Sequence, residues 1–381
     1  DLDGQRNSGG WDAFIIKYNP DGRKVWSRFA GPSRDGTGSA LTTSANGSIY
    51  IVGSTAGDID GQTHNGGLHD AFVSKFNPDG TKVWSRLIGT SDNDYGHAVT
   101  IGADGSIYIA GYTAVAIDGE TNSYGEPDSY SYNAFISKFN PDGTEEWSSF
   151  IASSDAVNNA LTTGADGAIY IAGYTAVNDV DRRKNNVSTD AFISKYNPDG
   201  TKVWSRLLSS PQNVFGNPNV TAHATTTGAD GSIYIAGLTE FDLDGQTSNG
   251  NNDAFITKYN PDGTKVWTKL LGSSHHEEGR ALSTGSDGSI YIAGFRHYLL
   301  VEQTYSTGVF DAFITKFNPD GTNVWTKLLG SSDNDYGYAV TTGADRSIYI
   351  AGRTRSDDLD GQTNTVGRDS FISKLIDPDE F

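Results

Sequence analysis

The chain contains no cysteine and no methionine among its 381 residues. Without cysteine there is no disulfide, no thiolate metal site and no cysteine nucleophile. The absence also favours an exported protein, because a cytosolic chain of this length usually carries a few thiols. Hydrophobic residues make up only 36% of the chain, and none of its apolar runs approaches the ~18 to 20 residues of a membrane-spanning helix.

Positive charge is also scarce, since 28 Lys and Arg stand against 47 Asp and Glu and the net charge is −19. Such a chain repels nucleic acid backbones and anionic membrane surfaces, so neither is expected as a partner. The sequence shows no signal peptide and no initial methionine, and we expect a processed chain or an excised segment. Together with the lack of cysteine, these features predict an extracellular or cell-surface protein.

The most informative feature of the chain is a repeated phrase, D-A-F-I-x-K-Y/F-N-P-D-G-T-x-x-W. Its phenylalanines are 58, 63, 57, 63, 58 and 58 residues apart. A period this regular indicates a repeat architecture, and we expect one domain over residues 1–381. The predicted repeats cover about 12–69, 70–132, 133–189, 190–252, 253–310 and 311–368, with a partial copy at 369–381.

Each repeat reads as four short strands. In the second copy, residues 70–77 and 81–88 flank the tight turn Pro78-Asp79-Gly80, and residues 97–102 and 106–113 flank Ala103-Asp104-Gly105. Proline fixes φ and glycine supplies the left-handed position that such turns need. The strands are apolar on both faces, which indicates sheets covered on both sides. Four antiparallel strands per unit, without a helix signal, predict an all-β propeller.

Three segments carry a family resemblance: D-A-F-I-x-K-Y-N-P-D-G, G-S-S-D-N-D-Y-G and D-G-S-I-Y-I-A-G-Y-T. They resemble the SBBP repeat, a bacterial β-propeller repeat found in long secreted or surface proteins, notably of cyanobacteria. The resemblance covers nearly the whole chain and implies the propeller fold. It implies no catalytic residues, because the family shares none.

The blade count predicts six blades of four antiparallel strands, with seven as the alternative. Five complete blades span roughly 38–88, 96–151, 158–208, 219–271 and 279–329. A sixth is expected to combine strands from both termini and so close the ring. Both termini supply a D-A-F strand, so the strand at 369–375 is left over. It could lie outermost, pair with another molecule, belong to a seventh blade, or mark a segment cut from a longer repeat protein.

Two acidic loops recur between the strands and are candidates for calcium. The loop D-x-D-G-Q-T supplies Asp58, Asp60, Gln62, Asp70, Asp242, Asp244, Asp358 and Asp360, and the loop S-D-N-D-Y-G supplies Asp92, Asp94, Asp333 and Asp335. Carboxylates two residues apart, with an amide carbonyl nearby, can converge on a hard cation. The alternative is an Asx turn, in which each aspartate caps its own backbone.

No motif of nucleophilic, phosphate-binding or zinc-dependent catalysis is present. His275-His276-Glu277-Glu278 is the one histidine cluster, and we expect a solvated loop there. The repeated tryptophans invite a lectin-like reading, but their apolar neighbours favour packing between blades. The repeated D-A-F lysines are expected to pair with carboxylates of an adjacent strand or blade.

We therefore expect a non-enzymatic structural, adhesive or protein-interaction module, possibly calcium-stabilised and self-associating through the spare strand. A carbohydrate-binding propeller is the alternative. A polysaccharide lyase or hydrolase acting from the divergent loops at 115–132, 208–220 and 295–310 is the second alternative.

Overall fold

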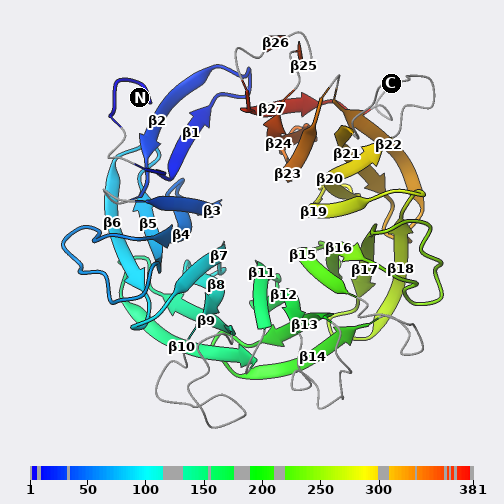
Figure 1. The fold of residues 1–381 in the computed structure, drawn as a ribbon. Helices are drawn as coiled ribbons and strands as arrows, with labels where there is room; N and C mark the ends of the chain where they lie inside the picture. Colours follow the sequence, from blue (N-terminus) through cyan, green and yellow to red (C-terminus); the bar gives the residue numbers. More distant parts are fainter. Residues whose placement is uncertain are drawn as a thin grey trace.

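The computed structural model of the protein shows a ring of antiparallel sheets arranged around a central axis (Figure 1). It describes residues 2–6, 10–31, 35–114, 132–152, 156–175, 189–209, 219–298, 309–330, 333–355, 358–359, 362–363 and 367–377. These residues form strands and turns only, and they include no helix with the length and hydropathy to cross a membrane. The all-β propeller predicted from the repeat is confirmed.

Five blades have four strands each, in sequence order from the axis to the rim. They are β3 (Gly36–Thr43), β4 (Ile49–Thr55), β5 (Asp70–Phe76) and β6 (Lys82–Ile88); β7 (Asp94–Ile101), β8 (Ile107–Thr113), β9 (Asn133–Phe139) and β10 (Glu145–Ala152); β11 (Ala156–Thr163), β12 (Ile169–Thr175), β13 (Asp190–Tyr196) and β14 (Lys202–Leu208); β15 (Val220–Thr227), β16 (Ile233–Thr239), β17 (Asp253–Tyr259) and β18 (Lys265–Leu271); and β19 (Glu277–Thr284), β20 (Ile290–Tyr298), β21 (Val309–Phe317) and β22 (Asn323–Leu329).

The sixth blade has three strands, β23 (Asp335–Thr342), β24 (Ile348–Thr354) and β27 (Asp369–Leu375). A two-stranded sheet, β25 (Asp358–Leu359) with β26 (Gln362–Thr363), precedes β27. The remaining strands, β1 (Phe14–Tyr18) and β2 (Lys24–Phe29), form a separate hairpin between the sixth blade and the first (Figure 1).

Six blades are thus present, but their closure differs from the predicted mixed blade. The C-terminal D-A-F-type strand β27 pairs with β24, with Gly352 opposite Phe371. The hairpin β1–β2 consequently forms its own sheet instead of completing the sixth blade. Both terminal D-A-F strands carry the same pattern, so local sequence gives no reason to prefer one over the other. The copy that follows β24 along the chain takes the place.

The core consists of seams between adjacent blades. Strands of the I-Y-I-A-G and D-A-F types are buried on both faces, as in β4 and β5. Each seam joins apolar side chains of two blades; for example, Val73 of the first blade packs with Ile107 and Ile109 of the second. The hairpin β1–β2 packs on the first blade in the same manner, through Ile15 and Trp26. The prediction of sheets covered on both sides is therefore confirmed.

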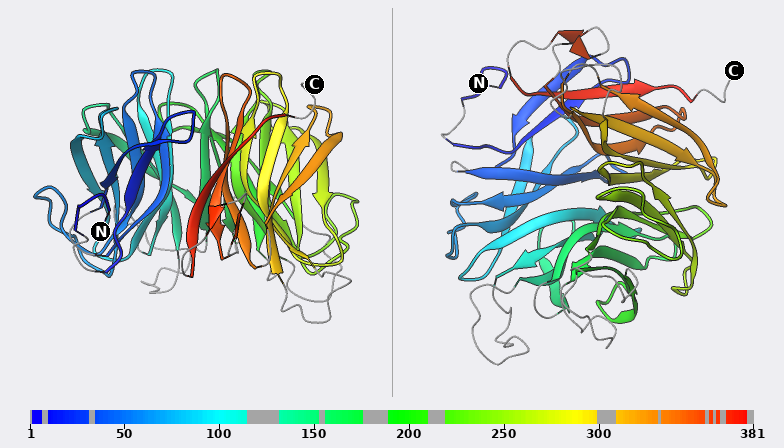
Figure 2. Two further views of the ribbon diagram at one scale, coloured as in Figure 1. Left: turned by 90° about the horizontal axis from the view of Figure 1, so that it is seen from above. Right: turned by 45° about the vertical axis from the view of Figure 1, so that its right-hand side comes forward.

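The two faces of the ring differ in their connections. Tight turns N-P-D-G and A-D-G-S gather on one face, here called the turn face (Figure 2, left). Gly80 in the first of these turns has φ +83°, and its N–H donates to the Asn77 carbonyl at 2.9 Å. The other face, the loop face, carries the longer connections. This division agrees with the one expected from the lengths of the connections.

Candidate functional site

The turn face is built from contacts that link consecutive blades. The carbonyl of Pro141 in the second blade accepts hydrogen bonds from Lys75 Nζ at 2.8 Å and from Trp84 Nε1 at 3.3 Å, both in the first blade. Pro78, Pro261 and Pro319 accept the same pair of bonds from their preceding sheets. The repeated tryptophans therefore pack against the next blade, and the reading of them as sugar platforms is not supported.

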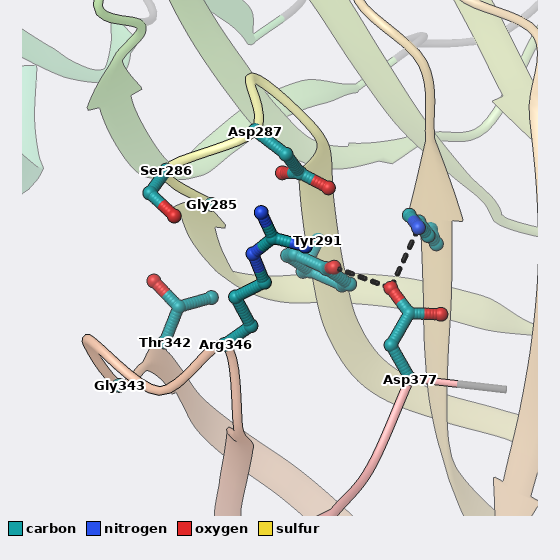
Figure 3. Close-up of a pocket in the computed structure, with 9 residues that line it drawn as sticks. Gly285, Ser286, Asp287, Tyr291, Thr342, Gly343, Arg346 and Asp377 are labelled. Atoms are coloured by element: carbon teal, nitrogen blue, oxygen red, sulfur yellow. Dashed lines mark hydrogen bonds and ion pairs between the residues drawn. The ribbon is translucent and has the colours of Figure 1, made fainter. Parts of the chain in front are cut away.

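The last of these links is different, because an aspartate replaces the carbonyl (Figure 3). Asp377 accepts hydrogen bonds from Lys316 Nζ at 2.6 Å, Tyr291 Oη at 3.0 Å and Trp325 Nε1 at 3.2 Å. The Lys316 and Asp377 side chains are only 7% and 6% exposed. They border a cavity of about 110 Å³ that is also lined by the turns at Asp287 and Arg346. This arrangement is an interblade link of higher charge, and the adjoining space holds only a few water molecules.

The repeated lysines pair with carboxylates as predicted. Lys195 lies 3.0 Å from Asp166 and Lys258 lies 3.4 Å from Asp230, and in both pairs the aspartate belongs to the adjacent A-D-G turn. These aspartates accept hydrogen bonds from their own turns as well, as Asp230 does from the Ser232 N–H. The turn face therefore repeats one set of structural contacts from blade to blade.

The D-x-D-G-Q loop on the loop face is a compact turn. Asp60 and Gly61 have φ values of +47° and +78°, and Ile59 and Gln62 exchange backbone hydrogen bonds across them. The Gln62 amide then binds the outer strand of the blade, donating to the Ser85 carbonyl at 2.7 Å and accepting from the Leu87 N–H at 3.1 Å. We call this loop the clasp, because Gln62 fastens it to β6.

The clasp aspartates are used by protein donors. Asp60 pairs with Lys82 at 2.5 Å, and Asp244 makes the same pair with Lys265. Asp58 and Asp242 accept the backbone N–H groups of His64 and Ser248, each at 2.9 Å. The Asx-turn reading therefore describes these four residues and Gln62.

The second acidic loop and the later clasp complete the predicted set. Asp92 and Asp333 accept the N–H groups of Asn93 and Asn334. The backbone of Asp358 lies in β25, and Asp360 lies outside the described residues. Within the described part of the chain, no three histidine or acidic side chains form a group that could hold a metal ion.

Pairs of buried carboxylates do form where two predicted residues come from different loops. Asp70 and Asp94 are 0% and 2% exposed, and a Cβ on Gly89 would lie 3.0 Å from Asp70 Oδ1 and 2.9 Å from Asp94 Oδ2. Burial, with a contribution from the charge of Asp70, raises the pKa of Asp94 to about 6. Burial likewise raises the pKa of Asp70.

The same pairing recurs in the fifth and sixth blades. Burial and the neighbouring charge of Asp335 raise the pKa of Asp311 to about 6. A Cβ on Gly330 would lie 2.5 Å from Asp311 Oδ1 and 2.9 Å from Asp335 Oδ2. A glycine at this position is therefore needed to bring the two carboxylates together.

A group of side chains that the sequence analysis did not single out lies around the axis. The innermost strand of each blade has a β-bulge at one position, so the residue there has no partner across the ladder; the bulge falls between Gly96 and Ala98 in the second blade and between Gly279 and Ala281 in the fifth. Bulges re-aim side chains and are common beside functional sites. The bulge residues are Ser39, His97, Asn159, His223, Arg280 and Tyr338, and we call them the axial belt.

Belt residues contact the next blade. Asn159 Nδ2 donates to the Ala222 carbonyl at 2.9 Å, and His223 Nδ1 lies 3.3 Å from the Gly279 carbonyl. A carbonyl only accepts, so Nδ1 of His223 carries the proton and Nε2 accepts from the Thr221 hydroxyl at 3.2 Å. Burial, followed by the charge of Arg280, lowers the pKa of His223 to about 4. His223 is therefore neutral at physiological pH.

The largest side chains of the belt belong to the fifth and sixth blades. Arg280 forms an ion pair with Glu278, and its guanidinium lies 5.5 Å from the ring centre of Phe295. In the sixth blade, the Tyr336 and Tyr338 rings stack at 6.1 Å with an angle of 5°. Arg353 lies 4.3 Å from the centre of the Tyr336 ring. Among the described residues, no carboxylate is within ion-pair distance of Arg353.

The histidine cluster lies at the same place and is more ordered than expected. Glu277 and Glu278 are 3% and 8% exposed, and His276 Nε2 lies 3.1 Å from Glu278 Oε1. The His276 ring also stacks on Phe295 at 6.0 Å. The prediction of a solvated loop is therefore wrong for the two glutamates, because they are residues of β19 and face the seam between blades.

The sequence held a signal for the belt that comparison of the repeats reveals. In the innermost strands, the residue before the constant alanine of each copy differs from most other copies, as in Gly-His-Ala, Gly-Arg-Ala and Gly-Tyr-Ala. A position that varies within an otherwise uniform strand is one that packing does not dictate. Only the ring, however, brings these positions together.

A second cavity, of about 480 Å³, lies between the fourth and fifth blades, lined by Leu271, Phe313 and Phe317 among others. At the corresponding seams, the clasp residues Ile59 and Leu243 pack among the equivalent apolar side chains. The cavity is thus the place that a clasp residue takes elsewhere. The connection at 299–308 lies outside the described residues.

Comparison with known proteins agrees with the fold. A domain of unknown function described as the DUF5122 β-propeller matches residues 228–265. Regulatory protein FlaEY of Caulobacter vibrioides is 27% identical over 239 residues, which is 54% of this chain and 24% of the relative. The WD repeat-containing protein L264 of Acanthamoeba polyphaga mimivirus is 20% identical over 75% of this chain and 26% of its own length.

Among solved structures, a protein of unknown function from Dyadobacter fermentans superposes with a TM-score of 0.50 and 12% identity, covering 90% of this chain and 95% of that one. This likeness concerns the fold alone. The chain spans about a quarter of the length of the two relatives above. Fold, repeat and matched segment together make this chain a β-propeller repeat protein.

Proposed function

We propose that this protein is a non-enzymatic binding module that contacts its partner through the axial belt and the loop-face residues beside it. The proposal rests on one observation: the bulge residue differs between blades, whereas the strand around it stays nearly constant. Residues needed for packing repeat in this chain, as the turn-face links do. A set that varies is available for recognition.

A protein partner is the leading candidate. Tyrosine and arginine are enriched where proteins bind each other, and the fifth and sixth blades offer Tyr336, Tyr338, Arg280 and Arg353 side by side. The net charge of −19 makes this group of cations unusual within the chain. A partner segment with exposed carboxylates fits it. An extracellular or cell-surface location and the SBBP type of the repeat belong to the same proposal, supported by the absent cysteine and the acidic charge.

An acidic carbohydrate is the second candidate. The specific support is Arg353, which lies over Tyr336 and within 5.8 Å of the Tyr338 ring centre, without a carboxylate partner in the described part of the chain. An aromatic face beside a guanidinium suits a sugar ring that bears a carboxylate or sulfate. A lyase or hydrolase would draw on the same residues, and release of reducing ends from the bound polysaccharide would identify it.

The experiment compares two matched double variants. Arg280→Ala with Tyr338→Ala removes belt side chains, and Arg23→Ala with Tyr18→Ala removes the same residue types from the exposed N-terminal hairpin. Both proteins and the wild type are applied to arrays of acidic peptides and of neutral and acidic glycans. We expect the belt variant to lose at least tenfold in affinity for the ligands that the wild type retains, and the hairpin variant to keep it. Equal binding by all three proteins would contradict the proposal.

Calcium stabilisation is part of the proposal, and we assign it to the carboxylate pairs rather than to the clasps. Its support is the pair Asp70–Asp94, in which Asp70 Oδ1 is buried, has no hydrogen-bond partner and lies 3.7 Å from His64 Nε2. Two buried carboxylates are costly without a shared proton or a cation. Plasma emission analysis of dialysed protein should find at least one calcium per chain. Asp94→Asn should reduce that content and Asp60→Asn should not; a wild-type content below one would rule calcium out.

A further inference from the structure

One D-A-F strand in the ring has an open edge. In each complete blade, the D-A-F strand lies between the I-Y-I-A-G strand and the tryptophan strand, as β5 lies between β4 and β6. Strand β1 pairs with β2 only, and the described residues place no strand on its other side. Its backbone groups on that side therefore lack the ladder that every equivalent strand of a complete blade has.

The phenylalanine of β1 shows what is missing. In complete blades this ring lies opposite a glycine of the I-Y-I-A-G strand, as Phe72 lies opposite Gly53 and Phe192 opposite Gly173. Phe72 and Phe192 are 0% exposed, whereas Phe14 is 49% exposed. A Cβ on Gly53 would lie 3.0 Å from the Phe72 ring, so the position opposite the ring favours glycine.

The two blades that flank this edge expose the same kind of surface. Leu41 of β3 is 56% exposed, although its counterpart Val99 is 7% exposed and packs on the preceding blade. Ile372 of β27 is 51% exposed, although its counterpart Ile136 is 0% exposed and packs on the following blade. Both residues therefore face the space between the sixth blade and the first, which we call the opening.

We propose that the opening is a docking site for a β-hairpin with the sequence type of the two inner strands of this repeat. Such a hairpin would extend β1 and β2 into a four-stranded blade. Its I-Y-I-A-G strand would pair with β1 and place its glycine opposite Phe14. Its small-residue strand would line the axis, and its faces would cover Leu41 and Ile372. The complete blades define this occupant residue by residue.

Other occupants fit less well. A D-A-F strand carries phenylalanine where glycine is needed, so two rings would meet opposite Phe14. A second folded copy offers no suitable strand, because every I-Y-I-A-G strand among the described residues is paired on both edges; these are β4, β8, β12, β16, β20 and β24. The partner is therefore a hairpin that is not already part of a closed blade.

The test uses a synthetic peptide of residues 94–113, which contains both inner strands and their turn. Hydrogen–deuterium exchange of the wild-type protein is followed with and without this peptide. We expect saturable binding and at least tenfold slower exchange in residues 14–18, with no change in the outer strand β6. The matched control peptide carries Gly111→Phe, which sets a ring against Phe14, and should protect at least tenfold less.

Three results would overturn the proposal. One is unchanged exchange in β1 at saturating peptide, and another is equal protection by the control peptide. The third is a dimer whose β1 amides are protected before any peptide is added, since a second copy would then fill the opening. The proposal does not depend on the axial belt: Arg280→Ala with Tyr338→Ala should bind the Phe14-directed peptide within about threefold of the wild type, so the two proposals fail separately.

Discussion

The turn face and the loop face are made from the same repeat, yet their aspartates behave in opposite ways. On the turn face, hydrogen bonds from Thr81 and Thr144 lower the pKa of Asp79 and Asp142. On the loop face, burial raises the pKa of Asp94 and Asp311 to about 6. The turn face therefore uses its charges for stability. The loop face holds charges at a cost, which is typical of surfaces kept for binding.

The largest effect should come from the charged interblade link. Lys316→Met leaves the Asp377 carboxylate buried without its cation, and we expect a loss of about 3 kcal/mol or more in the free energy of unfolding. Lys17→Met is the control, because its acceptor is the neutral Pro78 carbonyl at 3.0 Å, and it should cost about 1 kcal/mol. Urea denaturation measures both. Equal losses would show that the charge of Asp377 adds nothing to the link.

The difference between the aspartates can be tested by pH. The folded-state pKa of Asp94, about 6, lies above the ordinary value of 3.8. The folded protein therefore binds more protons between these values, and its stability falls as pH rises through this window. Asp94→Asn should stabilise the protein by about 2 kcal/mol above pH 6, and the gain should vanish near pH 4. Thermal unfolding measured between pH 4 and 8 gives the profile.

Asp142→Asn should show the opposite sign. The pKa of Asp142 is lowered in the folded state by Thr144, so its contribution is present at neutral pH and is lost as pH falls through the folded pKa. The variant should be less stable than the wild type at pH 7 and should approach it in acid. A parallel pH profile for the two variants would remove the distinction between the faces.

The clasp should give a smaller effect. Gln62→Ala removes one donated and one accepted hydrogen bond to β6, and we expect a loss of about 1 to 1.5 kcal/mol. Hydrogen exchange should be faster locally in residues 59–62. Gln62→Glu is the informative control, because it keeps the acceptor for the Leu87 N–H and loses only the donor. An unchanged exchange rate in Gln62→Ala would mean that the clasp is held by its turn alone.

The smallest effect should come from the exposed ion pair of the same loop. The Lys82 and Asp60 side chains are 36% and 32% exposed, so Lys82→Met should change stability by about 0.5 kcal/mol or less. The effect should also shrink in 1 M salt, where exposed charges are screened. Set beside Lys316→Met, this variant measures how far burial changes the worth of a Lys–Asp pair. A loss as large as that of Lys316→Met would contradict this account.

Local sequence was enough to predict most of the frame. The turns at Pro78-Asp79-Gly80 and Ala103-Asp104-Gly105, the strand order and the burial of the tryptophans follow from residues adjacent in the chain. The site was less accessible. Asp58 and Asp60 suggested convergence on a cation, but the Asp60 carboxylate turns to Lys82, 22 residues away. Asp70 and Asp94, from separate loops, are the pair that meets.

The sequence by itself determined the repeat, the propeller and the division into two faces, because each depends on periods and turns within one copy. The tertiary structure alone decided which D-A-F strand pairs with β24, since β1 and β27 carry the same pattern and compete for one edge. It also decided the membership of the axial belt and of the carboxylate pairs. Those residues are one blade or more apart, and only closure of blade upon blade brings them together.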